Sequence, residues 1–381
     1  MIDLQIFLVV SLILFATKAF GLITQKIHLP QVIGALIAGI ILGPNVLNLI
    51  EPNEAISLLA EFGIVLLLFS AGMETDFKQL RGAVKSAFLI AVMGILAAIG
   101  GGFAVSYFFG KPMFESFFIG IVIACSSTSI TVETLHEIGK IKTKSGVGIL
   151  GAALFEDILV ISLLAVVMGV GIGDFSIFDI GIVLLKIVAF FAFAVVSGLG
   201  LYKVLDYFYG KLGKSRRLTV FSLAYCFIMA YLAEQLGLAD VLGAYIAGVA
   251  LCNTRCVEYL DTKVHVLSYL FFTPVFIASI GIKTSFLGFS ANAVFVISLV
   301  VAAIILKAIG NSAAAKICRY SNEECMQVSS GLMTRGEVSI VIASRGIFEG
   351  IVDPLFLSSI TVVVIVTALL APGLIKKAYK S

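Results

Sequence analysis

The sequence predicts an all-α, polytopic membrane protein of about thirteen transmembrane helices, built as two inverted copies of six. Three observations lead to this fold class: the composition, the regular recurrence of apolar segments, and an internal repeat. The chain has 381 residues, of which 60% are hydrophobic and 13% charged, and its mean hydropathy is +1.12. Soluble domains carry about 25% charged residues, so this composition excludes a soluble globular protein.

Apolar segments long enough to cross a bilayer, at about 20 residues each, recur along the whole chain. The first segment has neither a basic leader nor a small-residue cleavage site, so we interpret it as a retained span rather than a signal peptide. The expected spans are residues 4–22, 30–49, 54–73, 86–109, 115–138, 146–171, 177–203, 217–236, 238–252, 264–282, 290–315, 323–348 and 353–375.

The basic residues between these spans gather on one side of the membrane. The loops that follow odd-numbered spans carry most of the Lys and Arg residues, whereas the loops on the other side hold only Lys111 and Lys283. Basic loops mark the cytoplasmic side of a membrane protein. We therefore expect a multi-pass protein of the cell inner (plasma) membrane, with the N-terminus outside and the C-terminus in the cytoplasm.

An internal repeat relates the two halves of the chain. The stretch "VIGALIAGIIL" at 32–42 resembles "VLGAYIAGVAL" at 241–251. The same offset in residue number relates "AGMETDF" at 71–77 to "IGIKTSF" at 280–286, and it relates Thr128 to Glu337. The matching second and ninth spans are seven apart in order, so the two copies cross the membrane in opposite directions. Inverted repeats of this kind are typical of secondary transporters.

The fifth and twelfth spans contain polar residues where a lipid-facing helix should be apolar. The fifth contains "ACSSTSITVETL" at 124–135, and the twelfth contains "MTRGEVSIVIASRG" at 333–346. Hydroxyl side chains and glycine tolerate unwound backbone inside a membrane, which predicts two broken helices that cross. Arg335 and Glu337 would neutralise the partial charges of the half-helix ends. The alternative is ordinary polar helix packing with an internal ion pair. The residues expected at the crossing are Thr128, Ser129, Arg335, Gly336 and Glu337.

Two adjacent acids, Glu156 and Asp157, interrupt the sixth span in "LFEDILVISL" at 154–163. A charge at mid-membrane costs at least about 2.5 to 3.5 kcal/mol, so this pair needs a partner or a function. Lys307 lies at a similar depth in the eleventh span and is the natural counter-ion for one of the acids. Adjacent residues of a helix point in different directions, so the second acid can face a water-filled cavity. A static brace between Glu156 and Lys307 is the alternative.

These residues carry a family resemblance. With "PQVIGALIAGIILGP" at 30–44, "EDILVI" at 156–161, Lys307 and "TRGEVSIVIA" at 334–343, the chain resembles the cation/proton antiporter superfamily of the monovalent cation:proton antiporter 2 type. It is most similar to the bacterial sodium/proton antiporter branch, and it also resembles the membrane domain of the potassium-efflux antiporters. The resemblance implies that Asp157 is the ion- and proton-binding aspartate and that Lys307 is its buried lysine.

The resemblance also implies a division into two domains, a homodimer and an elevator movement of one domain against the other. Helices 1–3 and 8–10, in residues 1–85 and 217–289, would form the dimer domain. Helices 4–6 and 11–13, in residues 86–171 and 290–381, would form the core domain. Residues 172–216 would contain the connecting helix 7.

The expected function is exchange of a monovalent cation for protons, because a desolvated carboxylate holds either a proton or an alkali cation but not both. Oxygens of Ser127 and Thr128 would complete the cation site at Asp157. We expect no enzyme activity, no cofactor and no nucleic-acid partner; the partners are the ions, membrane lipids and a second copy. The resemblance favours Na⁺, with Li⁺ possible, although the Glu–Asp pair differs from the Asp–Asp pair usual in electrogenic sodium exchangers and from the Gln–Asp pair of the potassium-efflux branch; the exchange would be electrogenic. A K⁺/H⁺ antiporter and a cation channel are the alternatives; an intramembrane protease is disfavoured because Asp157 has no second mid-membrane aspartate as a partner, apart from Asp240 at the start of the ninth span.

Overall fold

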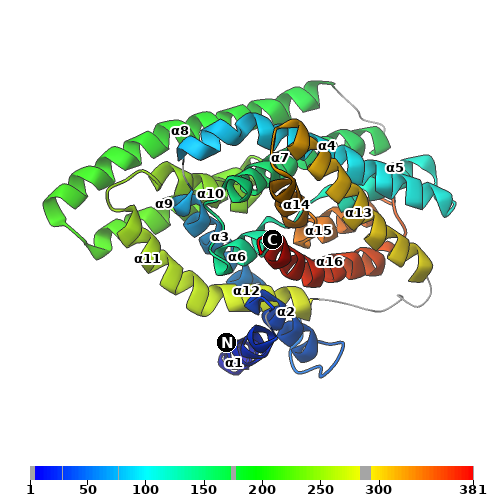
Figure 1. Ribbon diagram of the computed structural model, residues 1–381, viewed down its shortest axis with the longest axis horizontal. Coiled ribbons are helices and arrows are strands. Elements are labelled where there is room, and N and C mark those ends of the chain that lie inside the picture. Colours follow the sequence, from blue (N-terminus) through cyan, green and yellow to red (C-terminus); the bar gives the residue numbers. More distant parts are fainter. Residues whose placement is uncertain (1–4, 28, 76, 173–176, 284–292, 381) are drawn as a thin grey trace.

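The computed structural model describes residues 5–27, 29–75, 77–172, 177–283 and 293–380 (Figure 1). Every regular element in these ranges is helical, as predicted. A π-helical turn, η1 (Ser268–Phe272), joins α11 to α12. The α-helices are α1 (Gln5–Lys26), α2 (Gln31–Leu42), α3 (Glu54–Glu74), α4 (Phe77–Phe108), α5 (Met113–Ala124), α6 (Thr128–Glu137), α7 (Lys144–Ile172), α8 (Ile177–Leu212), α9 (Arg216–Gln235), α10 (Asp240–Leu251), α11 (Val257–Leu267), α12 (Thr273–Ile282), α13 (Ala293–Ile317), α14 (Asn322–Gly331), α15 (Glu337–Phe348) and α16 (Phe356–Ala378).

The helices agree with the thirteen predicted crossings. Within the described ranges, ten helical segments are long and apolar enough to span a membrane, with α5–α6 and α11–α12 each counted as one. Three shorter apolar helices, namely α2, α10 and most of α15, bring the total in these ranges to thirteen. The predicted polytopic all-α fold class is therefore confirmed.

The internal repeat of the sequence is also a repeat of the helices. α2 and α10 each have 12 residues, and their first residues, Gln31 and Asp240, differ by the offset seen in the sequence. α6 and α15 begin at Thr128 and Glu337, which differ by the same offset. α2 packs against α12, and α10 packs against α3, so each copy places its short second helix on the third span of the other copy. In the second match between the copies, residues 76 and 284–286 lie outside the described part of the chain.

Several helix ends differ from the predicted boundaries. α2 stops at Leu42 and not near residue 49, because Gly43 and Pro44 follow; the backbone N–H groups of Leu49 and Ile50 both donate to the Leu42 carbonyl instead. α4 begins at Phe77, before the predicted residue 86, and α8 continues beyond residue 203 to Leu212. A hydropathy window detects the part of a helix that suits lipid, and it cannot detect a polar extension into water.

Two groups of helices pack mainly within themselves. In the first, α4 contacts α5, α7 and α13, and α13 contacts α14 and α16; Figure 1 shows these helices on the right. In the second, α3 contacts α10 and α12, α10 contacts α9, and α1 contacts α2. α6 contacts α2 and α3 of one group and α7 and α16 of the other. The division into dimer and core domains stays a prediction; the two groups meet at α6 and at a contact between α2 and α16.

Candidate functional site

Both predicted helix breaks are present, and their backbones touch. Residues 125–127 separate α5 from α6, and residues 332–336 separate α14 from α15. The Ser127 backbone N–H donates to the Thr334 carbonyl at 2.7 Å, so each unwound segment satisfies a backbone group of the other. Unwound backbone is tolerated at membrane depth only where protein groups replace water in this way.

Hydroxyl side chains from the first break and from α6 satisfy carbonyls at the end of α14. Ser126 Oγ donates to the Leu332 carbonyl at 2.8 Å, and Thr131 Oγ1 donates to the Gly331 carbonyl at 2.7 Å. The last carbonyls of a helix have no partner within the helix. The run of Ser and Thr in the fifth span therefore completes the hydrogen bonding of the twelfth, which explains why both polar stretches occur in otherwise apolar sequence.

Lys307 ties the first break to the acidic helix. Its ammonium donates to the carbonyl of Ala124, the last residue of α5, at 2.5 Å, to Ser126 Oγ at 2.6 Å and to Glu156 Oε2 at 2.8 Å. Lys307 and Glu156 are both 0% exposed, so the predicted counter-ion pair exists and is fully buried. A cation at the C-terminal end of α5 also complements the negative end of that helix dipole.

Asp157 follows Glu156 on α7 and is 6% exposed. The Lys307 ammonium donates to both Glu156 and Ser126 of the first break, so the acidic pair lies beside that break. Ala153 lies one helical turn before Asp157 on the same face of α7, and it lines a small pocket with Ser127 and Thr128. The sequence-predicted hydroxyls and the aspartate therefore border the same region of the crossing.

The two predicted serines of the first break are buried, and the threonine is half-buried. Ser127 and Ser129 are 4% and 2% exposed, and their hydroxyl oxygens lie 3.2 Å apart. Thr128 is the first residue of α6 and reaches the partly accessible side of the break. The positive end of the α6 dipole lies at this residue.

Arg335 binds carbonyl groups at the second break. Its guanidinium is fully buried; Nη2 donates to the Ala303 carbonyl of α13 at 2.7 Å, and Nη1 donates to the Leu332 carbonyl at 3.4 Å. Arg335 thus places a positive charge at the C-terminal end of α14. Glu337 is the first residue of α15, but its side chain lies outside the described part of the structure, and so does the expected Arg335–Glu337 ion pair.

Gly336 lets the two breaks approach closely. A Cβ atom at this position would lie 2.7 Å from Ser127 Oγ and 2.8 Å from Ser127 Cβ, well inside van der Waals contact. The backbone of Gly336 is extended, with φ −138°, which any residue can adopt. The requirement for glycine is therefore a requirement for space at the crossing.

Asn311 is a site residue that the sequence analysis missed. It lies one helical turn after Lys307 on α13 and is fully buried, and neither atom of its amide has a hydrogen-bond partner among the described residues. Glu156 Oε1 also lacks such a partner in the described part of the chain. A Cβ atom on Gly94 of α4 would collide with Asn311 Oδ1 and lie 3.2 Å from Glu156 Oε1, so all three residues meet at one point. The sequence signal for Asn311 is its spacing of four residues from Lys307 in "KAIGN", which places both side chains on one face of the helix.

A further acid, Glu133 of α6, lies beside a cavity. It is only 9% exposed and lines a cavity of about 430 Å³ between α1, α2, α6 and α12. Glu137 lines the same cavity, and its carboxylate accepts two hydrogen bonds, at 2.8 and 2.9 Å, from the backbone N–H of Gln31 at the start of α2.

Two crossing broken helices inside an inverted repeat, with buried charges at the crossing, define a secondary transporter. The transmembrane model of the sodium/hydrogen exchanger family matches residues 9–380, so the chain belongs to the sodium/hydrogen exchanger family. This confirms the predicted family and makes the protein a transporter rather than an enzyme.

Relatives and solved structures are similar over nearly the whole chain. It is 34% identical over 378 residues to the Na⁺/H⁺-K⁺ antiporter GerN of Bacillus cereus, covering 99% of this chain and 97% of that protein. It is 32% identical over 369 residues to a Na⁺/H⁺ antiporter of Enterococcus hirae, covering 97% and 96%. The structure of the sodium proton antiporter MjNhaP1 from Methanocaldococcus jannaschii superposes with a TM-score of 0.72 at 15% identity, covering 97% of both chains, which shows a shared fold.

Proposed function

We propose that this protein exchanges Na⁺ for protons across the cell membrane and that Asp157 carries both ions in turn. The observation that carries the proposal is the fully buried Lys307–Glu156 pair beside Asp157 at the crossing of two broken helices. Burying three ionisable groups at membrane depth is costly, and groups retained there mark ion pathways. The relatives named as Na⁺/H⁺ antiporters support cation/proton exchange.

Coupling between the two flows follows from competition at Asp157. A single carboxylate with few polar neighbours binds a proton or a cation, and neither can bind while the other is present. Alkali cations prefer oxygen ligands, and Ser127 and Thr128 line a small pocket with Ala153, which lies one helical turn before Asp157 on α7. No cofactor takes part in this scheme, because the cation and the proton are the substrates.

Lys307 and Glu156 supply a second proton per cycle in this proposal. When Na⁺ reaches Asp157, Glu156 loosens from Lys307, and the buried ammonium releases a proton. When Na⁺ leaves, Lys307 takes up a proton and the 2.8 Å ion pair re-forms. Two protons would then exchange for one monovalent cation, so each cycle would move one net charge and the transport would be electrogenic.

An elevator movement would alternate the exposure of the site. The core domain, which holds both breaks, the acidic pair and Lys307, would move against the dimer domain of a homodimer. The packing of α4, α5, α7 and α13 as one group and of α3, α10 and α12 as another supports separate movement of the two groups. The basic loops support an orientation with the N-terminus outside and the C-terminus in the cytoplasm.

Potassium is the second candidate substrate. One relative is named a Na⁺/H⁺-K⁺ antiporter, which supports testing K⁺ beside Na⁺ and Li⁺. A cation channel is a weaker alternative, because a channel needs acids along its path but no buried lysine paired with one of them.

The test is exchange by the purified protein in proteoliposomes that contain a pH-sensitive dye. Na⁺, Li⁺ and K⁺ are added in turn to vesicles with an acidic interior. We expect saturable proton release with Na⁺ and none with Asp157→Asn protein inserted to the same density. A current that grows linearly with the imposed potential and needs no proton gradient would identify a channel instead.

A further inference from the structure

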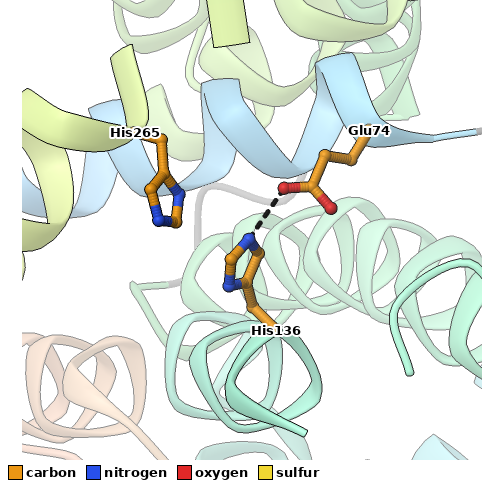
Figure 2. Close-up of side chains that lie close together, drawn as sticks. All are labelled: Glu74, His136 and His265. Atoms are coloured by element: carbon orange, nitrogen blue, oxygen red, sulfur yellow. Dashed lines mark hydrogen bonds and ion pairs between the residues drawn. The ribbon is translucent and has the colours of Figure 1, made fainter. Parts of the chain in front are cut away.

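Two of the three histidines of this chain lie close to a carboxylate that the proposed exchange mechanism does not use. Glu74 is the last residue of α3, His136 lies at the end of α6, and His265 lies in α11. Figure 2 shows the three side chains pointing toward a common space. One potential ligand atom from each residue can be chosen so that all three lie within 4.8 Å of one another. His136 Nε2 donates to Glu74 Oε1 at 2.7 Å.

We propose that Glu74, His136 and His265 bind a divalent transition-metal ion of the zinc class and that the bound ion holds α6 against α3 and α11. Two imidazole nitrogens and one carboxylate form a donor set that zinc uses in proteins, with water in the fourth position. Alkali and alkaline-earth cations prefer oxygen ligands, so this set selects against the cations that the transporter moves.

The distances in the cluster suit such an ion after a small adjustment. In a tetrahedral site with Zn–N and Zn–O bonds of about 2.0 to 2.1 Å, neighbouring ligand atoms lie about 3.4 Å apart. The ligand atoms here already lie within 4.8 Å, so rotation of the side chains closes the remaining gap without movement of a helix. His136 and Glu74 are 22% and 13% exposed in their side chains, which leaves a path for the ion and a place for water.

The surroundings hold the imidazole rings and add negative charge. Tyr269 stacks on His265 with ring centroids 4.0 Å apart and packs against His136 at 4.7 Å. Asp261 lies one helical turn before His265 on α11 and accepts a hydrogen bond of 2.6 Å from Ser70, which lies one turn before Glu74 on α3. A carboxylate behind the first ligands stabilises a bound cation and orients ligating histidines.

The position of the cluster gives the ion a mechanical effect. Glu74 and His265 come from helices assigned to the dimer domain, and His136 comes from the helix that begins at Thr128 in the crossing. An ion bound to all three would join the two domains at the end of the membrane that carries the basic loops, and it would stop the elevator movement. This consequence rests on the proposed function, whereas the metal site itself does not.

The first measurement is binding, because it needs no transport. Purified protein whose histidine tag has been removed is titrated with Zn²⁺ by calorimetry and with Co²⁺ by visible absorption. We expect one ion per chain and, for His265→Phe, which keeps a ring against Tyr269 but has no nitrogen ligand, at least about 100-fold weaker binding. His265→Cys supplies a thiolate ligand, and we expect it to keep tight binding. Equal affinities of the wild type and His265→Phe would overturn the site.

The second measurement is Na⁺/H⁺ exchange in proteoliposomes with Zn²⁺ on the basic-loop side. We expect inhibition of the wild type that EDTA reverses, and exchange by His265→Phe that Zn²⁺ does not inhibit. Zinc binding through His265 without inhibition would overturn the clamp. Asp157→Asn is the control, because it should bind zinc like the wild type while transporting nothing. A protein that binds zinc through His265 but exchanges no cation contradicts the proposed antiport and supports the metal site.

Discussion

Replacing Lys307 by Gln tests both the stability and the charge movement that the buried pair is proposed to control. The substitution removes an ammonium that donates three hydrogen bonds, to Ala124, Ser126 and Glu156, none longer than 2.8 Å. Because both charges are fully buried, the loss of one leaves the other without compensation. Breaking a buried pair in this way costs about 3 to 5 kcal/mol.

The stability cost should come from the Glu156 carboxylate, which Lys307→Gln leaves buried without its partner. The double variant Glu156→Gln/Lys307→Gln has no buried charge at this position and should be more stable than Lys307→Gln. Unfolding can be followed by a thiol-reactive dye, because four of the six free cysteines are buried. Equal unfolding temperatures for the single and double variants would show that the pair contributes little.

Lys307→Gln should also change how exchange responds to the membrane potential. If each cycle of the wild type moves one net charge, a potential of 100 mV acts on it with about 2.3 kcal/mol, equivalent to a roughly 50-fold ion gradient. Lys307→Gln has no second proton carrier, so its exchange should respond little to the same potential. The assay is Na⁺-driven proton movement in proteoliposomes under a potassium–valinomycin potential of either sign. Wild-type rates that ignore the potential would refute the reasoning and reduce Lys307 to a structural counter-ion.

Four further predictions concern other parts of the site. Asp157→Asn should abolish exchange while the protein still inserts and unfolds at a temperature near that of the wild type; residual Na⁺-driven proton movement would exclude Asp157 as the carrier. The apparent KM for Na⁺ should rise as the pH falls, with an unchanged maximal rate, by at least about tenfold per pH unit where Na⁺ displaces the Asp157 proton and by up to about 100-fold where Lys307 releases its proton as well; a pH-independent KM would contradict the shared site. Gly336→Ala should destabilise the crossing by about 1 to 3 kcal/mol, and adding Ser127→Gly should restore it, because the clash involves Ser127 Oγ and Cβ; failure of the second substitution to rescue would show that the contact is not the cause. Asn311→Leu should lower exchange about tenfold if the Asn311 amide orients Glu156. If the amide has no role in transport, the same variant should exchange ions like the wild type and be equally stable or more stable.

The class of this protein follows from the sequence alone, because the bilayer imposes a simple rule on composition. A helix that crosses the membrane typically needs about 20 apolar residues, so thirteen largely apolar segments are visible in the sequence without any knowledge of packing. The constant offset between the two copies defines the inverted repeat, and the structure keeps that offset, with half-helices that begin at Thr128 and Glu337. Local sequence therefore determines which segments cross and where two of them break.

The depth of a residue in the membrane can also be estimated from the sequence, and this is why the pairing of Lys307 with Glu156 was predicted correctly. A charge near the middle of a span has so few possible partners that matching depths were enough to pair Lys307 with Glu156, and the structure places them 2.8 Å apart. The direction in which a side chain points is not readable in the same way. The expected pair of Arg335 with Glu337 lies outside the described part of the structure, and the described partners of Arg335 are carbonyls that the sequence did not indicate, among them that of Ala303 on another helix.

The contacts between segments far apart in the sequence were decided only by the tertiary structure. The meeting of Asn311, Gly94 and Glu156 joins three helices, and no pattern within one helix reveals it. The same holds for Glu74, His136 and His265, which lie far apart in the sequence and converge only because α3, α6 and α11 pack together. Helix periodicity specifies a face of one helix, whereas the partner of that face depends on how all the helices share the available space.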